Sequence, residues 1–210
     1  MTENQQYLRH FAMPTSVKIM ARSSSITNTF VNGIIPVVWP SAEEVRDALQ
    51  ILGMLEVVTC AYCGDPHTEW DHFRPLVVGQ RPTGFITEIY NLVPACGKCN
   101  QSKGNKNWHT WIRSGAPRSP ASRGVIDLDT RVERLHAYEA WGSPRSIDFV
   151  DVAGEDLWHQ HWQNHARILE LMREAETLAG RIRERVETNF KLHQAVSPPQ
   201  DIATSLNDLQ

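Results

Sequence analysis

Cys60-Ala-Tyr-Cys63 and Cys96-Gly-Lys-Cys99 contain all four cysteines of this 210-residue chain. Two residues separate the thiols of each pair, a spacing that lets both thiolates face one metal ion. Four thiolates are the ligand set of a closed tetrahedral Zn²⁺ site, which leaves no open position for catalysis. Two disulfides are the alternative, which a reducing compartment disfavours. The sequence predicts a structural Zn²⁺ ion held by Cys60, Cys63, Cys96 and Cys99.

The segment between these two Cys-x-x-Cys turns, called zinc knuckles below, is longer than a simple zinc ribbon needs. Residues 68–73 are typical of a strand, residues 74–84 of a loop, and residues 85–93 of a second strand. A helix is expected after Pro94. Structural zinc contributes on the order of 10–16 kcal/mol in small peptides, so this strand-strand-helix unit is expected to need its metal to fold.

Polar residues surround the second knuckle in a characteristic order. Trp70-Asp71-His72-Phe73-Arg74-Pro75 lies between the knuckles, Asn91-Leu92-Val93-Pro94-Ala95 precedes Cys96, and Asn100-Gln101-Ser102-Lys103 follows Cys99. With these elements in this order, residues 60–106 resemble an HNH endonuclease of the ββα-metal, or His-Me finger, superfamily in its zinc-bearing form. The resemblance does not extend to the flanking arms.

The resemblance implies a role for each polar residue. His72 would be the general base, Asn91 would steady the loop that bears it, and Asn100 would take the third motif position, where Asn is a common variant. Asp71 and Asn100 would bind one divalent cation, Mg²⁺ or Mn²⁺. Lys103 would lie near the same helical face as Asn100 and contact phosphate. The cut ends would carry a 5′-phosphate and a 3′-hydroxyl.

Phosphodiester hydrolysis requires the same residue types that the resemblance implies. The attacking water needs a proton acceptor, and the leaving oxygen needs nearby positive charge. A histidine with an ordinary pKa of about 6.5 is largely neutral at slightly alkaline pH and accepts that proton, while carboxylate and amide oxygens suit Mg²⁺. Neighbours on a regular strand point to opposite faces, so Asp71 and His72 share a site only if the strand ends or twists there.

Positive charge is concentrated in one segment, although the formal net charge of the chain is −3. Residues 89–126 contain six basic side chains and no acidic one. Such a segment suits contact with DNA phosphates, and a solvated loop is the alternative. The residues expected to bind nucleic acid are Lys98, Lys103, Lys106 and Arg113.

The flanking regions are expected to be mostly helical. A capping box of Ser41 and Glu44 predicts a helix over 41–52, and residues 20–38 are interpreted as an arm with one short strand. Trp108 and Trp111 are more typical of a core than of base stacking. Apolar residues at helical spacing over 157–186 predict one long helix, which packs on its own domain or forms a homodimer seam.

These observations predict an α+β fold with a central zinc-stapled ββα-metal (HNH) unit, an N-terminal arm and helix, and a helical C-terminal region. The expected segments are 1–53, 54–126 and 127–196, with a loose tail over 197–210. No apolar stretch reaches the roughly 20 residues of a membrane span, and no signal peptide opens the chain, so a cytoplasmic protein is expected.

The expected function is metal-dependent cutting of double-stranded DNA, with a sequence-specific role such as restriction or another defence activity. A nicking, homing or mobile-element nuclease is the alternative within the same chemistry. A zinc-bound nucleic-acid-binding module without catalysis and a structural zinc domain for protein contacts are the alternatives outside it.

Overall fold

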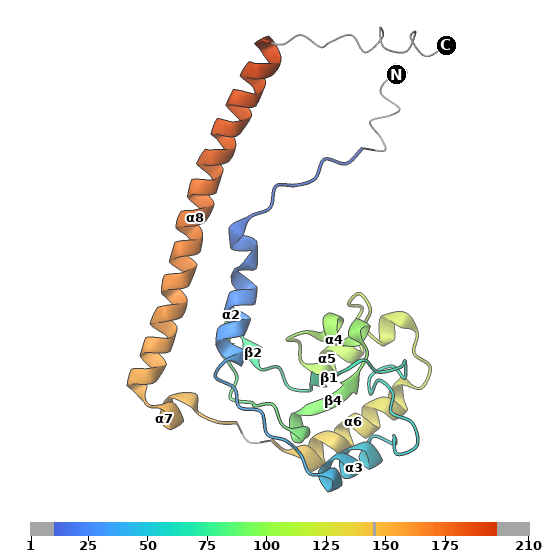
Figure 1. Cartoon of the computed structure of the whole chain (residues 1–210). Coiled ribbons are helices and arrows are strands. Elements are labelled where there is room, and N and C mark those ends of the chain that lie inside the picture. The colour runs from blue at the N-terminus through green and yellow to red at the C-terminus, as the bar shows by residue number, and fades with distance from the viewer. Residues whose placement is uncertain (1–10, 145, 197–210) are drawn as a thin grey trace, which may run out of the picture. The chain divides into compact units, whose positions relative to one another are not determined.

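Figure 1 shows the computed structural model of the chain, in which residues 11–144 and 146–196 are described. The chain divides into two compact units: residues 24–165, and a second unit that joins residues before 24 to residues after 165. The tail expected at 197–210 lies outside the described residues. The described elements are η2 (Ile19–Arg22), α2 (Ser23–Asn32), α3 (Ala42–Ile51), β1 (Glu69–His72), β2 (Val77–Val78), β3 (Arg81–Pro82), η3 (Ile89–Asn91), β4 (Leu92–Ala95), α4 (Gly97–Lys103), α5 (Trp108–Ile112), η4 (Ala121–Arg123), α6 (Leu128–Gly142), α7 (Phe149–Ala153) and α8 (Glu155–Val196), where η marks a 3-10 helix.

A two-stranded antiparallel sheet of β1 and β4, followed directly by α4, forms the centre of the larger unit. Asp71 pairs with Val93 and His72 with Leu92. The mixture of helices and small sheets agrees with the expected α+β class, and β1 confirms the strand expected over 68–73. The second strand is shifted: residues 89–91 form η3, and the strand runs from Leu92 to Ala95. The expectation over 85–93 was wrong because no strand lies beside residues 85–88; only Thr87 makes a bridge there.

The segment after β1, expected as a loop, contains a minimal hairpin of β2 and β3. Its two turn residues, Gly79 and Gln80, both have positive φ. Two such residues match the turn geometry that joins adjacent antiparallel strands without splaying them. The hairpin places Leu76 and Val77 in the smaller core of the unit.

The N-terminal arm is helical, which corrects the strand expected within residues 20–38. Thr27 and Val31, four residues apart on α2, are buried, and Val31 packs in the smaller core with Leu76 and Trp162. Burial of this face outweighs the weak helix propensity of a Ser-, Thr- and Asn-rich segment. The capping box of Ser41 and α3 is confirmed by both of its hydrogen bonds.

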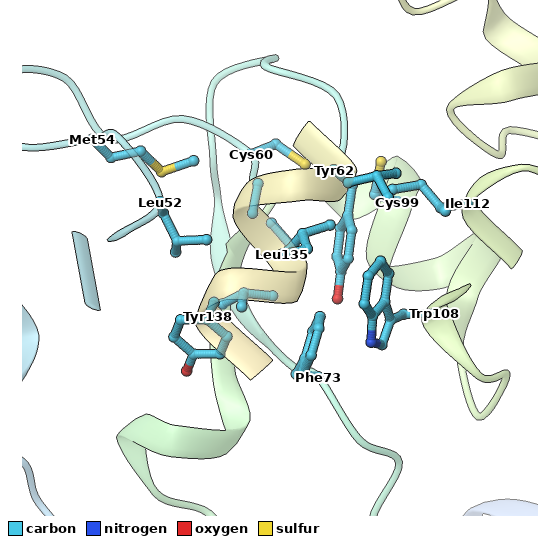
Figure 2. Close-up of a cluster of buried hydrophobic side chains, with 14 of the residues drawn as sticks. Leu52, Met54, Cys60, Tyr62, Phe73, Cys99, Trp108, Ile112, Leu135 and Tyr138 are labelled. Carbon is cyan, nitrogen blue, oxygen red and sulfur yellow. The ribbon is translucent and has the colours of Figure 1, made fainter. Parts of the chain in front are cut away.

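The larger core of the unit packs the segment that contains the four cysteines against helices that precede and follow it in the sequence. Figure 2 shows Tyr62 and Phe73 packed near Trp108 of α5 and Leu135 and Tyr138 of α6. The rings of Phe73 and Trp108 stack with their centroids 4.9 Å apart. Trp108 and Trp111 are almost completely buried, so the core interpretation of the tryptophans is confirmed.

The predicted long helix is confirmed as α8, which spans 42 residues. Its first part packs in the larger unit, where Trp162 and His165 are buried. In the second unit, Glu176 of α8 accepts a hydrogen bond from the backbone nitrogen of Met20 at 3.0 Å. Among the described residues, no helix combines the length and the apolar composition needed to cross a bilayer.

Candidate active site and metal centre

The four cysteines meet in one cluster. Their Sγ atoms lie within 4.8 Å of one another, and Sγ of Cys63 is 3.7 Å from Sγ of Cys96. Four ligands bound at about 2.3 Å around a tetrahedral zinc ion would be about 3.8 Å apart. The thiols are free rather than joined as disulfides. The donor set and its spacing therefore fit a closed, tetrahedral metal site of the kind the sequence predicts.

Backbone hydrogen bonds fix the first knuckle against the sheet. The backbone nitrogen of Ala61 donates to the carbonyl oxygen of Pro94 at 2.8 Å, and Gly64 closes the turn by donating to Cys60 at 2.8 Å. Gly64 has a φ of 82°, a conformation that residues with a side chain rarely adopt. The second knuckle begins α4, with Cys96 as the residue that precedes the helix. The cysteine cluster thus joins the sheet to the helix.

Arg123 is a residue at the cluster that sequence reasoning missed. Its guanidinium donates to Sγ of Cys99 at 3.1 Å and pairs with Asp65 at 3.1 Å. Four thiolates around a divalent ion carry a net charge of −2, so a guanidinium in contact with one sulfur offsets part of that charge. The only sequence signal for this role is the location of Arg123 in the acid-free segment.

Asp71 is buried near the end of β1, where its carboxylate interacts with the side chains of Tyr62 and Lys103. Its Oδ2 accepts a hydrogen bond from the hydroxyl of Tyr62 at 2.7 Å and lies 3.0 Å from Nζ of Lys103. Burial raises the pKa of Asp71, and the positive charge of Lys103 opposes that shift. Tyr62 lies between Cys60 and Cys63 in sequence, so the first knuckle contacts the Asp71 carboxylate directly.

Lys103 does not lie where a phosphate contact was expected. Its side chain is 0% exposed, and its ammonium donates to the backbone oxygens of His72 at 2.8 Å and Gly104 at 3.2 Å. Burial lowers the pKa of Lys103, while the carboxylate of Asp71 opposes this shift. The expectation of a surface cation is corrected: Lys103 is an internal cation that holds the end of β1.

His72 ends β1 and lies half-buried beside Thr87. Its Nε2 is 2.9 Å from Oγ1 of Thr87. Burial, together with the charge of Lys103, lowers the pKa of His72 from 6.5 to about 4. The imidazole is therefore neutral near pH 7. When Nε2 carries the proton and donates a hydrogen bond to Oγ1 of Thr87, Nδ1 keeps a free lone pair.

Asp71, His72 and Asn100 line one cavity of about 170 Å³, together with Gly104 and Asn105. Strand alternation alone would place Asp71 and His72 on opposite faces. Both reach the cavity because β1 ends at His72, where regular alternation stops. The structure brings together the three residues that the resemblance assigns to the general base and the cation.

Asn91 is completely buried and connects the two sides of the loop that follows His72. Its Oδ1 accepts from the backbone nitrogen of Arg74 at 2.7 Å, and its Nδ2 donates to the backbone oxygens of Arg74 at 3.1 Å and Ile86 at 3.3 Å. All three contacts are to the backbone. The side chain thus acts as a clamp on the chain that leaves β1.

Two asparagines of α2 line the same cavity, and sequence reasoning missed both. Asn28 and Asn32 lie one helical turn apart, and Nδ2 of Asn32 donates to the backbone oxygen of Asn28 at 2.8 Å. Because residues 20–38 were interpreted as an arm with a strand, Asn28 and Asn32 were not expected to lie on one face of a helix. The usable signal is their spacing of four residues within a segment that contains no acidic side chain.

The basic residues expected at a DNA surface have different partners. Arg113 pairs with Asp129 at 2.7 Å, Lys98 lies 3.9 Å from Asp65, and Nζ of Lys106 donates to the backbone oxygen of Ser102 at 2.6 Å. Acidic residues outside the basic segment thus offset part of its charge. Lys98, Lys106 and Arg113 remain exposed, unlike Lys103.

The histidine pair on α8 faces α2. Nε2 of His161 lies 3.1 Å from the backbone oxygen of Phe30, and Nε2 of His165 lies 2.9 Å from Oγ1 of Thr27. Their spacing resembles that of metal ligands, but both rings pack between helices. Their contacts with Phe30 and Thr27 therefore hold α8 against α2.

Comparison with known proteins agrees with this geometry. Residues 60–106 match the family model of the HNH endonuclease. This segment is an HNH endonuclease domain. Over 140 residues, 64% of the chain, the sequence is 30% identical to the CRISPR-associated endonuclease Cas9 of Corynebacterium diphtheriae. The chain spans only 12% of the length of that relative. No solved structure matches the chain.

The zinc cluster predicts the effect of Cys96→Ser. Loss of one thiolate opens the tetrahedral site and removes much of the metal's contribution to folding, so we expect the cooperative thermal transition of the zinc-loaded protein to be lost or strongly lowered. Circular dichroism and zinc content by mass spectrometry measure the two effects. A strong chelator should destabilise the wild type to the same extent and the variant no further. An unchanged melting temperature in Cys96→Ser would contradict a structural metal.

The hydrogen bond from Tyr62 to Asp71 predicts a coupling between the two side chains. Tyr62→Phe removes a donor to a buried carboxylate, which should lower the free energy of unfolding by about 1.5–3 kcal/mol in urea denaturation of the zinc-loaded protein. In an Asp71→Asn background the same substitution should cost less. Tyr138→Phe is the matched control, because its hydroxyl donates to the backbone oxygen of Leu92 instead. Equal costs of Tyr62→Phe in both backgrounds would refute the coupling.

Proposed function

We propose that the HNH domain hydrolyses phosphodiester bonds of double-stranded DNA, with His72 as the general base and one Mg²⁺ or Mn²⁺ ion bound by Asp71 and Asn100. The observation that carries this proposal is the convergence of these three residues on one small polar cavity. A neutral imidazole, a carboxylate and an amide at one point supply the proton acceptor and the cation ligands that the reaction needs.

The donor set at the cavity fits a hard divalent cation. The Asp71 carboxylate contacts both Tyr62 and Lys103 through Oδ2. Oδ1 is therefore the oxygen that takes part in neither interaction. Together with the amide oxygen of Asn100 it gives few protein ligands, which is usual for Mg²⁺, whose remaining positions go to water and phosphate oxygens. When bound, the ion supplies positive charge to the phosphate and its leaving oxygen. Such a sparse site should be filled well only with DNA present.

The chain's own residues prepare His72 for proton transfer. Thr87 engages Nε2, so the imidazole is oriented and Nδ1 is the nitrogen that accepts the proton of the attacking water. Lys103 holds the backbone oxygen of His72, and Asn91 clamps the following residue. We therefore assign Lys103 and Asn91 to positioning rather than to contact with the reacting phosphate. By the family resemblance, the products carry 5′-phosphate and 3′-hydroxyl ends.

His72→Ala tests this mechanism. Loss of a general base typically reduces the rate by roughly 10²–10⁴-fold, while DNA affinity measured with Ca²⁺ in place of Mg²⁺ should stay close to that of the wild type. Cleavage of supercoiled plasmid and of large phage genomes with Mg²⁺ or Mn²⁺ gives the rate. His67→Ala is the control, because His67 bonds to the backbone of Val58 and does not line the cavity. Intact DNA with wild-type protein and every metal would instead support a binding module without catalysis.

We also propose that Asn28 and Asn32 contact DNA at the cleavage site. Amide side chains donate to phosphate oxygens and to base edges. The double variant Asn28→Ala/Asn32→Ala should weaken DNA binding in Ca²⁺ and lower the cleavage rate. Thr29→Ala on the same helix is the control, because Thr29 does not line the cavity. Unchanged affinity and rate in the double variant would remove α2 from the DNA interface.

A defence role is the use we propose for this activity. The similarity to a CRISPR-associated endonuclease supports it, although that similarity covers a small part of the relative. Sequence-specific restriction remains our preferred form, and a nicking, homing or mobile-element nuclease remains the alternative. Run-off sequencing of cleaved genomic DNA distinguishes them by revealing the target and the type of cut.

Assembly and location remain predictions. A homodimer through α8 would use its exposed apolar residues Leu171, Leu178, Ile182 and Val186. Their spacing follows the helical repeat, which is the pattern expected of a helix-helix seam. A cytoplasmic location is proposed from the sequence alone.

A further inference from the structure

Three side chains of metal-ligating types meet on the larger unit, and they belong neither to the four-cysteine cluster nor to the lining of the cavity. His109 belongs to α5, and His136 and Glu139 lie three residues apart on α6. One ligand atom from each lies within 4.8 Å of the others. Nε2 of His109 is 2.8 Å from Oε2 of Glu139. The three groups therefore converge from two helices on one point at the protein surface.

We propose that His109, His136 and Glu139 form a second metal site, which binds a divalent transition ion of the class of Zn²⁺ or Ni²⁺. Two imidazoles and one carboxylate are ligands that these ions favour, whereas Mg²⁺ prefers an all-oxygen set. Three protein ligands leave at least one position for water. The site should thus bind its ion more weakly than the four cysteines bind theirs.

Neighbouring side chains already orient the ligands. Oε1 of Glu139 accepts a hydrogen bond from the guanidinium of Arg74 at 3.1 Å, which directs Oε2 toward His109. A partner on the far oxygen of a ligating carboxylate is a common feature of metal sites. This arrangement is more than a surface ion pair of His109 and Glu139, because His136 supplies a third donor.

The ring of Trp108 packs against the imidazoles of both His109 and His136. The ring of His109 stacks on it with centroids 3.8 Å apart, and the ring of His136 meets it at 5.1 Å. Because Trp108 is only 2% exposed, it is a fixed platform for the two rings. Less side-chain freedom is lost when such ligands bind a metal than when two mobile surface histidines do.

A bound ion would connect α5 to α6. The two helices belong to different segments of the chain, and both contribute to the core that encloses Tyr62 and Phe73. Because the three ligands come together only in the folded protein, binding should stabilise the fold, and this stabilisation should grow with the logarithm of the metal concentration once that exceeds the dissociation constant. This inference does not rest on the proposed nuclease activity.

Titration of the full chain, without a histidine tag and with its four-cysteine site loaded with Zn²⁺, tests the proposal with Ni²⁺ in isothermal calorimetry. We expect one additional metal ion per chain and a higher melting temperature in its presence. His136→Asn and Glu139→Gln should each weaken binding by roughly 10-fold or more, a loss of the size seen for altered metal-site partners. His159→Asn, which changes an exposed histidine of α8, should bind like the wild type.

A second measurement separates this site from exchange at the cysteines. Co²⁺ bound by nitrogen and oxygen gives weak visible bands, whereas Co²⁺ bound by thiolates adds intense charge-transfer absorption. The proposal requires the weak bands alone in the wild type and their loss in His136→Asn. Circular dichroism of each metal-free variant verifies its fold. The proposal fails if the wild type binds no additional Ni²⁺, if both variants bind like the wild type, or if only thiolate absorption appears.

Discussion

The candidate site depends on four cysteine side chains that are placed to share one cation. The first knuckle carries Tyr62, whose hydroxyl binds the carboxylate of Asp71. The second knuckle begins α4, which carries Asn100 and Lys103. The cysteine cluster therefore fixes both the strand side and the helix side of the cavity lined by Asp71, His72 and Asn100. A two-stranded sheet and a seven-residue helix cannot hold such positions by themselves, because short isolated elements are marginally stable in water.

Local signals in the sequence were sufficient for the features that one segment determines by itself. The cysteine pairs, β1, the capping box of Ser41 and the long helix α8 all follow from spacing within a short window. The predictions that were wrong concern features that depend on contacts between segments far apart in the sequence. α2 is helical because Val31 is buried in a core that also contains Trp162, and residues 85–88 make only the single bridge of Thr87 to Val37 instead of a paired strand. Spacing within the segment contains no information about those partners.

Lys103 shows why site residues are harder to predict than site elements. Its position on α4, three residues after Asn100, was predicted correctly. Its role was not, because an interior lysine and a surface lysine have the same sequence signature. Only the structure shows that Lys103 neutralises Asp71 and holds the backbone oxygen of His72. A buried ion pair of this kind is costly to disrupt, since the remaining partner would be an uncompensated charge.

The HNH segment is not self-sufficient, although it contains every residue assigned to the reaction by resemblance. Tyr62 and Phe73 pack against Trp108, Leu135 and Tyr138, all of which lie beyond residue 106. Excision of residues 60–106 would expose this apolar surface to water, at an energetic cost that rises with the area exposed. The cavity itself receives Asn28 and Asn32 from α2, far upstream of the motif. The similarity to the Cas9 relative likewise extends over 140 residues, more than the 60–106 motif alone.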